Sequence, residues 1–125
     1  MQAHNKFTIL LVDDCDFSLK AESSMLEQMG YEVSEAHNAY LALKILSKKQ
    51  IDFVITDIEM PHISGDELSY LIHRRYPDLP ILAVTSAERT VIKNTEHAQF
   101  KEILAKPLTA KKVLKHIEQI NYRIN

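Results

Sequence analysis

The chain alternates between short apolar runs and segments whose apolar residues repeat with the period of a helix. Runs of strand type cover residues 7–13, 31–35, 52–57, 80–85 and 101–105. Three of them, 7–13, 52–57 and 80–85, are almost continuously apolar, which is typical of parallel strands covered on both faces. Residues 31–35 alternate between apolar and polar side chains, so this strand is predicted at an edge of the sheet.

Helix signals lie between these strands and after the last one. Apolar residues on one helical face predict four helices, which contain Met25, Leu26 and Met29; Ala42, Ile45 and Leu46; Leu68, Leu71 and Ile72; and Val113, Ile117, Ile120 and Ile124. Gly30 is expected to end the first helix, Asn38 to cap the second and Thr109 to cap the last. A fifth helix is predicted over residues 88–98, on weaker apolar spacing. Repeated strand–helix units predict an open, doubly wound α/β sheet with five helices.

Composition narrows the class of protein. A length of 125 residues favours one domain, and 46% hydrophobic with 26% charged residues is typical of a soluble globular chain. A net charge of −2 argues against direct binding to nucleic acid, and the short apolar runs argue against a membrane span. The single cysteine, Cys15, cannot form an intramolecular disulfide, and the N-terminus does not resemble a signal peptide. A cytoplasmic location is therefore expected.

The residues at the carboxyl ends of the strands are the candidate functional residues. In a doubly wound sheet the ligand site lies beyond these ends, where the strand order reverses. The residues found there are Asp13 and Asp14, Asp57, Thr85 and Ser86, and Lys106 and Pro107. The predicted fold thus brings three carboxylates, hydroxyl groups and an ammonium group to one edge.

This set of groups predicts a site that handles a phosphoryl group. Carboxylates ~5 Å apart repel by roughly 3 kcal/mol per pair at an effective dielectric of ~20, so they need a nearby cation. Lys106 supplies one positive charge, and oxygen ligands of this kind suit Mg²⁺, which supplies two. A metal, a lysine and a hydroxyl donor stabilise a transferring phosphoryl group, and the remaining carboxylate can attack phosphorus in line.

The order of these motifs resembles the receiver domain of two-component response regulators, of the chemotaxis-Y type. The matching motifs are Leu11-Val12-Asp13-Asp14, Ile55-Thr56-Asp57-Ile58-Glu59-Met60-Pro61, Gly65, Thr85-Ser86 and Lys106-Pro107. The resemblance covers residues 7–121 and implies a single receiver domain over 1–125. It also implies a flavodoxin-like sheet with the strand order 2-1-3-4-5.

The resemblance assigns the catalytic roles. Asp57 matches the aspartate that accepts a phosphoryl group from a phosphohistidine. Thr85 matches the switch hydroxyl, and Lys106 matches the lysine that pairs with the phosphoryl group. The Lys106–Pro107 peptide bond is expected to be cis. The expected donor is a histidine kinase or a histidine phosphotransfer protein, and the domain is expected to catalyse its own phosphorylation and dephosphorylation rather than to turn over a separate substrate.

The resemblance also implies a Mg²⁺ site. Asp14 matches the acid that binds the metal directly, and Asp13 matches its partner, which acts directly or through water. Asp57 and the backbone carbonyl of Glu59 match the further ligands.

Two departures from the family pattern concern the output of the signal. Ile103 stands where the family usually has Tyr or Phe, and Ala98-Gln99-Phe100-Lys101 replaces a loop that usually carries Gly-Ala. Neither change touches the phosphorylation chemistry, but both affect the usual aromatic relay. An output partner is expected at the face formed by the 88–98 helix, the 101–105 strand and the last helix. The chain acts alone or as a piece of a longer regulator or hybrid histidine kinase.

Other interpretations are less consistent with the residues. A Mg²⁺-dependent hydrolase with an aspartyl-phosphate intermediate needs Asp-x-Asp, and Asp57-Ile58-Glu59 lacks the second aspartate. A flavin electron carrier needs a phosphate cradle where Asp14-Cys15-Asp16 would repel phosphate. Asp13 and Asp14 could also be a helix N-cap pair. Cys15 is expected to be a small filler residue, because a neighbouring carboxylate disfavours its thiolate.

Overall fold

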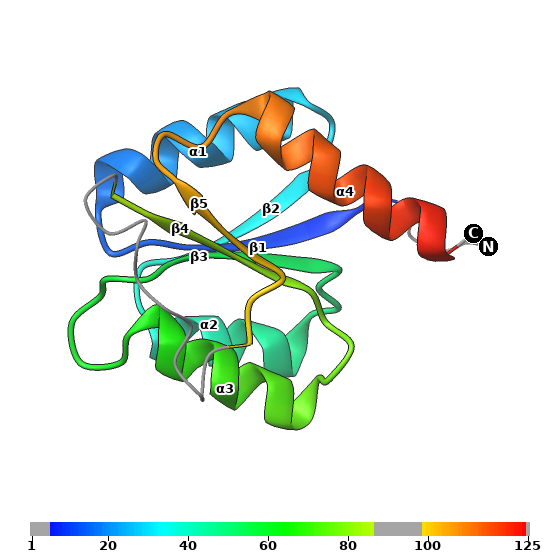
Figure 1. The fold of residues 1–125 in the computed structure, drawn as a ribbon. Coiled ribbons are helices and arrows are strands. Elements are labelled where there is room, and N and C mark those ends of the chain that lie inside the picture. The colour runs from blue at the N-terminus through cyan, green and yellow to red at the C-terminus, as the bar shows by residue number, and fades with distance from the viewer. Residues whose placement is uncertain (1–5, 87–98, 125) are drawn as a thin grey trace.

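The computed structural model describes residues 6–86 and 99–124, in which five parallel strands form one sheet. The strands are β1 (Thr8–Val12), β2 (Glu32–Ala36), β3 (Phe53–Asp57), β4 (Ile81–Thr85) and β5 (Glu102–Ala105). Their order is β2-β1-β3-β4-β5, and every neighbouring pair is parallel (Figure 1). The predicted strand order and the edge position of the second strand are both confirmed.

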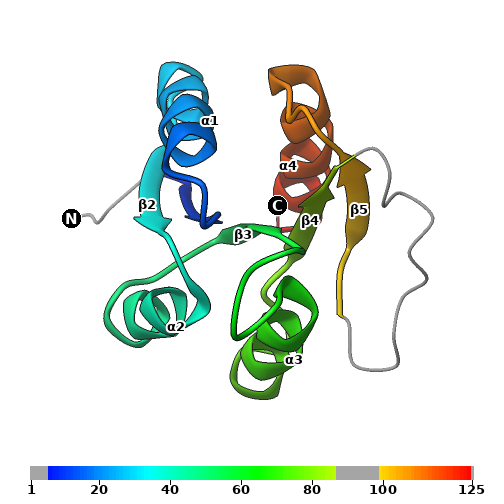
Figure 2. The ribbon, with the colours of Figure 1, turned by 90° about the vertical axis from the view of Figure 1, so that its left-hand side faces the viewer.

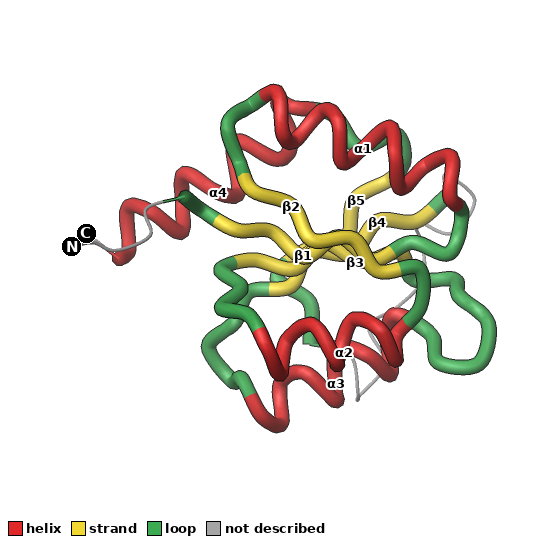
Figure 3. Tube along the Cα trace, turned by 180° about the vertical axis from the view of Figure 1, so that it is seen from behind, coloured by secondary structure: helices red, strands yellow, loops and turns green. Residues whose placement is uncertain are grey.

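The described helices cover both faces of the sheet. They are α1 (Asp16–Gln28), α2 (Ala39–Lys48), α3 (Gly65–Arg75) and α4 (Ala110–Ile124). Helices α1 and α4 lie on one face and α2 and α3 on the other, so the chain forms three layers (Figures 1 and 3). This is a flavodoxin-like α/β fold. The helix predicted over 88–98 lies outside the described residues, and no described helix is long and apolar enough to cross a membrane.

The two faces of the sheet bury separate hydrophobic clusters. Because successive strand residues point to opposite faces, Ile9 and Leu11 pack in the cluster under α1 and α4, whereas Leu10 and Val12 pack in the cluster over α2 and α3. Strands β1, β3 and β4 are buried at every position. Burial on both faces explains their nearly continuous apolar sequences.

Local signals set the helix ends as predicted. The side chain of Asn38 accepts a hydrogen bond from the Leu41 amide at 2.8 Å, and the Thr109 hydroxyl accepts one from the Lys112 amide at 3.3 Å. Gly30 follows the C-cap of α1 with φ +99°, a conformation that glycine adopts without strain. These caps fix where α2 and α4 begin and where α1 ends.

Strand register places the carboxyl ends side by side. Val12 lies opposite Thr56, Asp57 opposite Val84 and Thr85 opposite Ala105. The residues that follow these positions therefore emerge at one edge, which Figure 2 views with α1 and α4 above it and α2 and α3 below. The cis Lys106–Pro107 bond lies in the loop after β5, as predicted.

Helix α3 starts in contact with the end of β3. The Gly65 amide donates to the Ile58 carbonyl at 2.8 Å. A Cβ atom at position 65 would overlap the carbonyl oxygen of Asp57 and would lie 2.8 Å from the Cα of Ile58. Only glycine therefore allows the helix to approach the backbone of Asp57 so closely.

Gly65→Ala is expected to lower the free energy of unfolding by about 1–3 kcal/mol, because the methyl group must displace backbone. Urea unfolding measures this loss, and the amide resonance of Asp57 should shift in the same variant. Gly30→Ala is the control: it strains a positive φ but meets no atom within 4 Å, so it should leave Asp57 unchanged. A Gly65→Ala variant with wild-type stability and a wild-type Asp57 resonance would contradict the argument.

Candidate functional site

Three carboxylates meet at the carboxyl edge of the sheet. Oxygen atoms of Asp13, Asp14 and Asp57 all lie within 4.8 Å of one another, and we call these three residues the acid cluster. Asp13 and Asp57 are 2% and 8% exposed, whereas Asp14 is exposed to solvent. The cluster is thus mostly buried and opens to water on the side of Asp14.

Asp13 links the start of α1 to the acid cluster. Its Oδ1 accepts a hydrogen bond from the Cys15 amide at 2.9 Å, directly before α1 begins. Its Oδ2 lies 3.3 Å from the Nζ of Lys106. One oxygen therefore holds the turn before α1 and the other faces Lys106. The N-cap of α1 is Cys15, so the alternative that Asp13 and Asp14 are a helix N-cap pair is not supported.

Lys106 is the cation nearest to the buried carboxylates among the described residues. Its Nζ lies 3.3 Å from Asp13 Oδ2 and 3.5 Å from Asp57 Oδ2, and its side chain is 29% exposed. Its backbone amide donates to the Thr85 carbonyl at 2.7 Å, which aligns the loop after β5 with the end of β4. One ammonium group is thus shared by two carboxylates.

The single positive charge of Lys106 does not offset the cost of burying the Asp57 carboxylate. Burial raises the pKa of Asp57; Lys106 opposes this shift, Asp13 adds to it, and a backbone hydrogen bond from Glu59 opposes it. Burial tends to lower the pKa of Lys106, but Asp57 and Asp13 outweigh burial and raise it. The ammonium group therefore stays protonated, while Asp57 remains harder to ionise than an ordinary aspartate.

Thr85 brings a hydroxyl group to the same edge. The residue is fully buried, and its Oγ1 has no hydrogen-bond partner among the described residues. The buried hydroxyl of Thr56, by contrast, bonds to the carbonyl of Asp57 at 2.9 Å. A buried hydroxyl without a hydrogen-bond partner costs about 1–3 kcal/mol of stability. A ligand that offers Thr85 an acceptor atom would remove this cost.

Glu22 is a fourth carboxylate close to the site, and it was not among the predicted residues. Burial raises its pKa to about 7; Asp13 and Asp57 add to the shift and Lys106 opposes it. Leu19 and Leu26, both buried, lie three positions before and four positions after Glu22 on α1. This spacing places Glu22 on the inward face of the helix and is the sequence signal that could have identified it.

The expectation for Cys15 was wrong. The thiol is exposed rather than packed as a filler. Hydrogen bonds with the backbone and the side chain of Ser18 lower its pKa, although the Asp13 carboxylate opposes the shift. The hydrogen bonds in the first turn of α1 therefore lower the pKa of Cys15 by more than the neighbouring carboxylate raises it.

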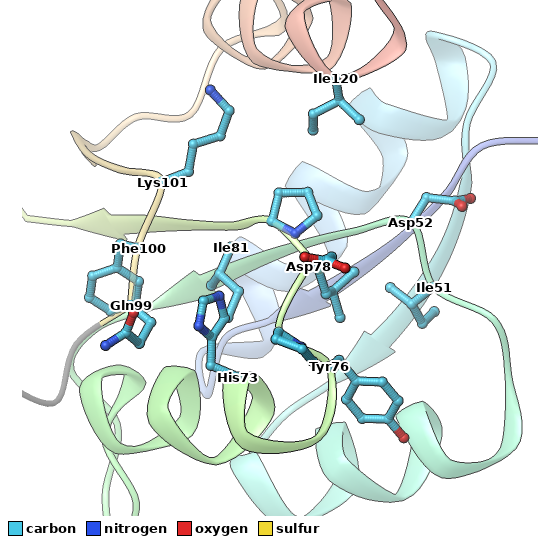
Figure 4. A pocket seen from close by; sticks show the side chains of 13 residues that line it. Ile51, Asp52, His73, Tyr76, Asp78, Ile81, Gln99, Phe100, Lys101 and Ile120 are labelled. Atoms are coloured by element: carbon cyan, nitrogen blue, oxygen red, sulfur yellow. The ribbon is translucent and has the colours of Figure 1, made fainter. Parts of the chain in front are cut away.

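A separate hollow of about 820 Å³ lies at the opposite, amino edge of the sheet (Figure 4). It is lined by Ile51, Tyr76, Ile81 and Phe100 together with charged side chains. Two of the charged groups are already engaged: Asp52 accepts from the Thr8 amide at 2.8 Å, and Lys101 donates to Gln119 at 2.6 Å. Among the described residues, the charged and polar side chains that point toward one common ligand position are those at the acid cluster and not those around this hollow.

A family model described as the response regulator receiver domain matches residues 9–118. The chain belongs to this family. Receiver domains are phosphoacceptor switches of two-component systems rather than enzymes that turn over a separate substrate, and the acid cluster is typical of their phosphoacceptor and Mg²⁺ site. The family assignment predicted from the sequence motifs is confirmed.

Relatives of this receiver domain include a stand-alone protein and a much longer one. It is 32% identical over 121 residues to the chemotaxis protein CheY of Pseudomonas aeruginosa, covering 94% of this chain and 98% of CheY. It is 32% identical over 106 residues to the aerobic respiration control sensor protein ArcB of Escherichia coli, covering 81% of this chain. That second match spans only 13% of the length of ArcB.

Solved structures share the fold. The crystal structure of the response regulator TrrA of Thermotoga maritima, in complex with Mg²⁺-BeF, superposes with a TM-score of 0.78 and 29% sequence identity. The match covers 90% of this receiver domain and 97% of TrrA. The similarity therefore extends over nearly the whole of both chains.

Asp57→Asn is expected to stabilise the metal-free receiver domain by on the order of 1–3 kcal/mol, because it removes one of several crowded charges. Urea unfolding in EDTA measures this gain, and added Mg²⁺ should shrink it by stabilising the wild type more. Asp78→Asn, an exposed acid at the amino edge, should have little effect. An Asp57→Asn midpoint equal to or below that of the wild type in EDTA would contradict the expectation.

Glu22→Gln is expected to change how stability depends on pH. Because the folded state raises the pKa of Glu22 from 4.5 to about 7, it binds more protons than the unfolded state in this window, and stability falls as pH rises through it. Glu22→Gln should lack this part of the fall in stability. Above the window, its free energy of unfolding should exceed that of the wild type by on the order of 1–2 kcal/mol, after allowance for solvent screening.

Urea midpoints in EDTA, below and above this pH window, test the prediction for Glu22. Glu27→Gln is the matched control, because Glu27 is an exposed acid on the same helix. Parallel pH curves for the wild type and Glu22→Gln would show that Glu22 has an ordinary pKa.

Proposed function

We propose that this receiver domain accepts a phosphoryl group on the carboxylate of Asp57. The observation that carries the proposal is the acid cluster, with carboxylate oxygens within 4.8 Å of one another and Lys106 Nζ at 3.3 and 3.5 Å from two of them. Such crowding of negative charge disfavours folding unless a cation offsets it. The membership of the chain in the receiver-domain family supports the same role.

The residues of the acid cluster fit Mg²⁺. Hard oxygen donors, one of them open to solvent, leave room for the waters that this ion retains. Asp13, Asp14 and Asp57 would supply carboxylate oxygens, and Glu59 its backbone carbonyl. The similar protein TrrA was crystallised with Mg²⁺-BeF, which supports this choice of ion. When bound, Mg²⁺ neutralises charge on the phosphoryl oxygens.

The side chains of the chain itself perform the transfer. A carboxylate oxygen of Asp57 attacks phosphorus, the new O–P bond forms as the P–N bond to the donor imidazole breaks, and the leaving nitrogen keeps the electron pair. Lys106, held protonated by Asp57 and Asp13, pairs with the added negative charge. Thr85 donates its hydroxyl, which has no partner among residues 6–86 and 99–124, to a phosphoryl oxygen. The same groups support later attack by water, so phosphorylation and dephosphorylation are both self-catalysed.

The proposed phosphodonor is a histidine kinase or a histidine phosphotransfer protein. The relatives support this partner, since they include a sensor protein that carries a segment similar to this chain. The proposed output surface consists of β5 and α4, together with residues 88–98. Leu114 on α4 is 42% exposed, and Ile103 on β5 is half-buried, so both offer apolar contacts to an output partner.

Incubation with acetyl phosphate and Mg²⁺ tests the proposal by intact mass. The wild type should gain one acid-stable, base-labile phosphoryl group, and Asp57→Asn should gain none, because an amide is a far weaker nucleophile. Asp52→Asn, an acid at the other edge of the sheet, is the control and should be phosphorylated normally.

Two other results would refute the phosphoacceptor role. Rapid, sustained release of phosphate would indicate the hydrolase alternative. Retained phosphate on Asp57→Asn would show that another residue is the acceptor.

A further inference from the structure

Lys112 holds the backbone on both sides of Lys106. Its Nζ donates to the carbonyl oxygen of Ala105 at 3.1 Å and to that of Pro107 at 3.2 Å. These are the residues directly before and after Lys106. A side chain of α4 thus connects the end of β5 to the loop that leads into its own helix.

The location of Lys112 is unfavourable for a cation. The residue lies in the first turn of α4, which contains no acidic residue. The start of a helix carries partial positive charge and favours anions. A lysine ammonium group has three donors and can bind two carbonyls at once, which compensates for this position. A side chain that opposes a local preference while it makes two specific bonds indicates a function beyond helix formation.

The other contacts of the loop hold its two ends. The Lys106 amide donates to the Thr85 carbonyl at 2.7 Å, and Leu108 is buried in the core beside α1 and α4. The Ala105 carbonyl belongs to the same peptide unit as the Lys106 amide, and the Pro107 carbonyl lies between that amide and Leu108. Rotation of either peptide unit would swing the long side chain of Lys106 away from Asp13 and Asp57.

We propose that Lys112 is a positioning residue for Lys106, an inference that rests on the proposed function of Lys106 at the phosphoryl group. Both hydrogen bonds of Lys112 go to backbone carbonyls, and among the described residues Lys112 forms no ion pair with a carboxylate of the acid cluster. Lys112 therefore acts through the placement of Lys106 and not by direct contact with the carboxylates. Loss of its two hydrogen bonds leaves Lys106 in the chain but no longer oriented toward the carboxylates.

The test compares three variants of the full chain. Lys112→Met keeps the length of the side chain and removes its donors. Lys112→Arg restores donors, and Lys111→Met removes an exposed lysine from the same helix turn. Two readouts are used: the rate of phosphorylation by acetyl phosphate with Mg²⁺, and the ¹³C resonance of the Lys106 ε-methylene group in EDTA, assigned with Lys106→Arg.

Lys112→Met is expected to slow phosphorylation by about tenfold and to move the Lys106 resonance toward that of a solvated lysine, because misplaced catalytic groups lose rate steeply. Lys112→Arg should recover most of both signals, and Lys111→Met should match the wild type. The resonance does not depend on phosphorylation, so it still tests the positioning role if the wild type fails to accept phosphate.

Three results would overturn the inference. The first is a wild-type rate and resonance in Lys112→Met. The second is a lower urea midpoint in Lys112→Met with an unchanged Lys106 resonance, which is a structural role only. The third is an equal loss of rate in Lys111→Met, which is a general effect of charge.

Discussion

Electrostatic repulsion among the carboxylates of the acid cluster is the constraint on which the rest of the site depends. The parallel sheet brings the ends of β1 and β3 together, and two of the three acids there are buried. Lys106 contacts both buried carboxylates, yet the pKa of Asp57 stays raised. Burial is the largest cause of this raised pKa and repulsion from Asp13 adds to it, so the fold keeps buried, crowded carboxylates at one edge. Strain of this kind is typical of functional sites, where a ligand relieves it.

Backbone interactions hold the acids in this arrangement. Gly65 lets α3 pack directly against the carbonyl of Asp57, and the amide of Cys15 fixes one oxygen of Asp13. The bond from the Lys106 amide to Thr85 aligns the loop after β5 with β4. Because these contacts involve the backbone, the acid cluster does not depend on flexible surface side chains for its shape. This preorganisation favours charge stabilisation during phosphoryl transfer.

Much of this architecture could be predicted because it follows from local patterns. Continuous apolar runs identified β1, β3 and β4, and the rule that parallel strands end at one edge located Asp13, Asp57 and Lys106. Other features depend on tertiary contacts. His116 is 3% exposed; its Nδ1 lies 3.5 Å from Lys101 Nζ and its Nε2 lies 3.6 Å from Glu102 Oε1. These contacts arise only from the packing of α4 against β5.

Features of three residues could not be predicted from the sequence. Glu22 shares the inward spacing of Leu19 and Leu26, but the predicted inward face of this helix was identified from apolar residues alone. The bridge from Lys112 to two carbonyls depends on the conformation of the loop after β5, which no periodicity describes. Cys15 was predicted from its acidic neighbours alone, whereas hydrogen bonds within the first turn of α1 decide its environment.

The central claim is that the acid cluster exists to bind a cation and a phosphoryl group together. A crystal structure with Mg²⁺ and beryllofluoride, which mimics the phosphoryl group, tests this claim most directly. We expect beryllofluoride on the carboxylate of Asp57, Mg²⁺ between it and the carboxylates of Asp13 and Asp14, and both Lys106 Nζ and Thr85 Oγ1 within hydrogen-bond distance of fluorine. Beryllofluoride bound elsewhere, or Mg²⁺ outside the acid cluster, would contradict the account.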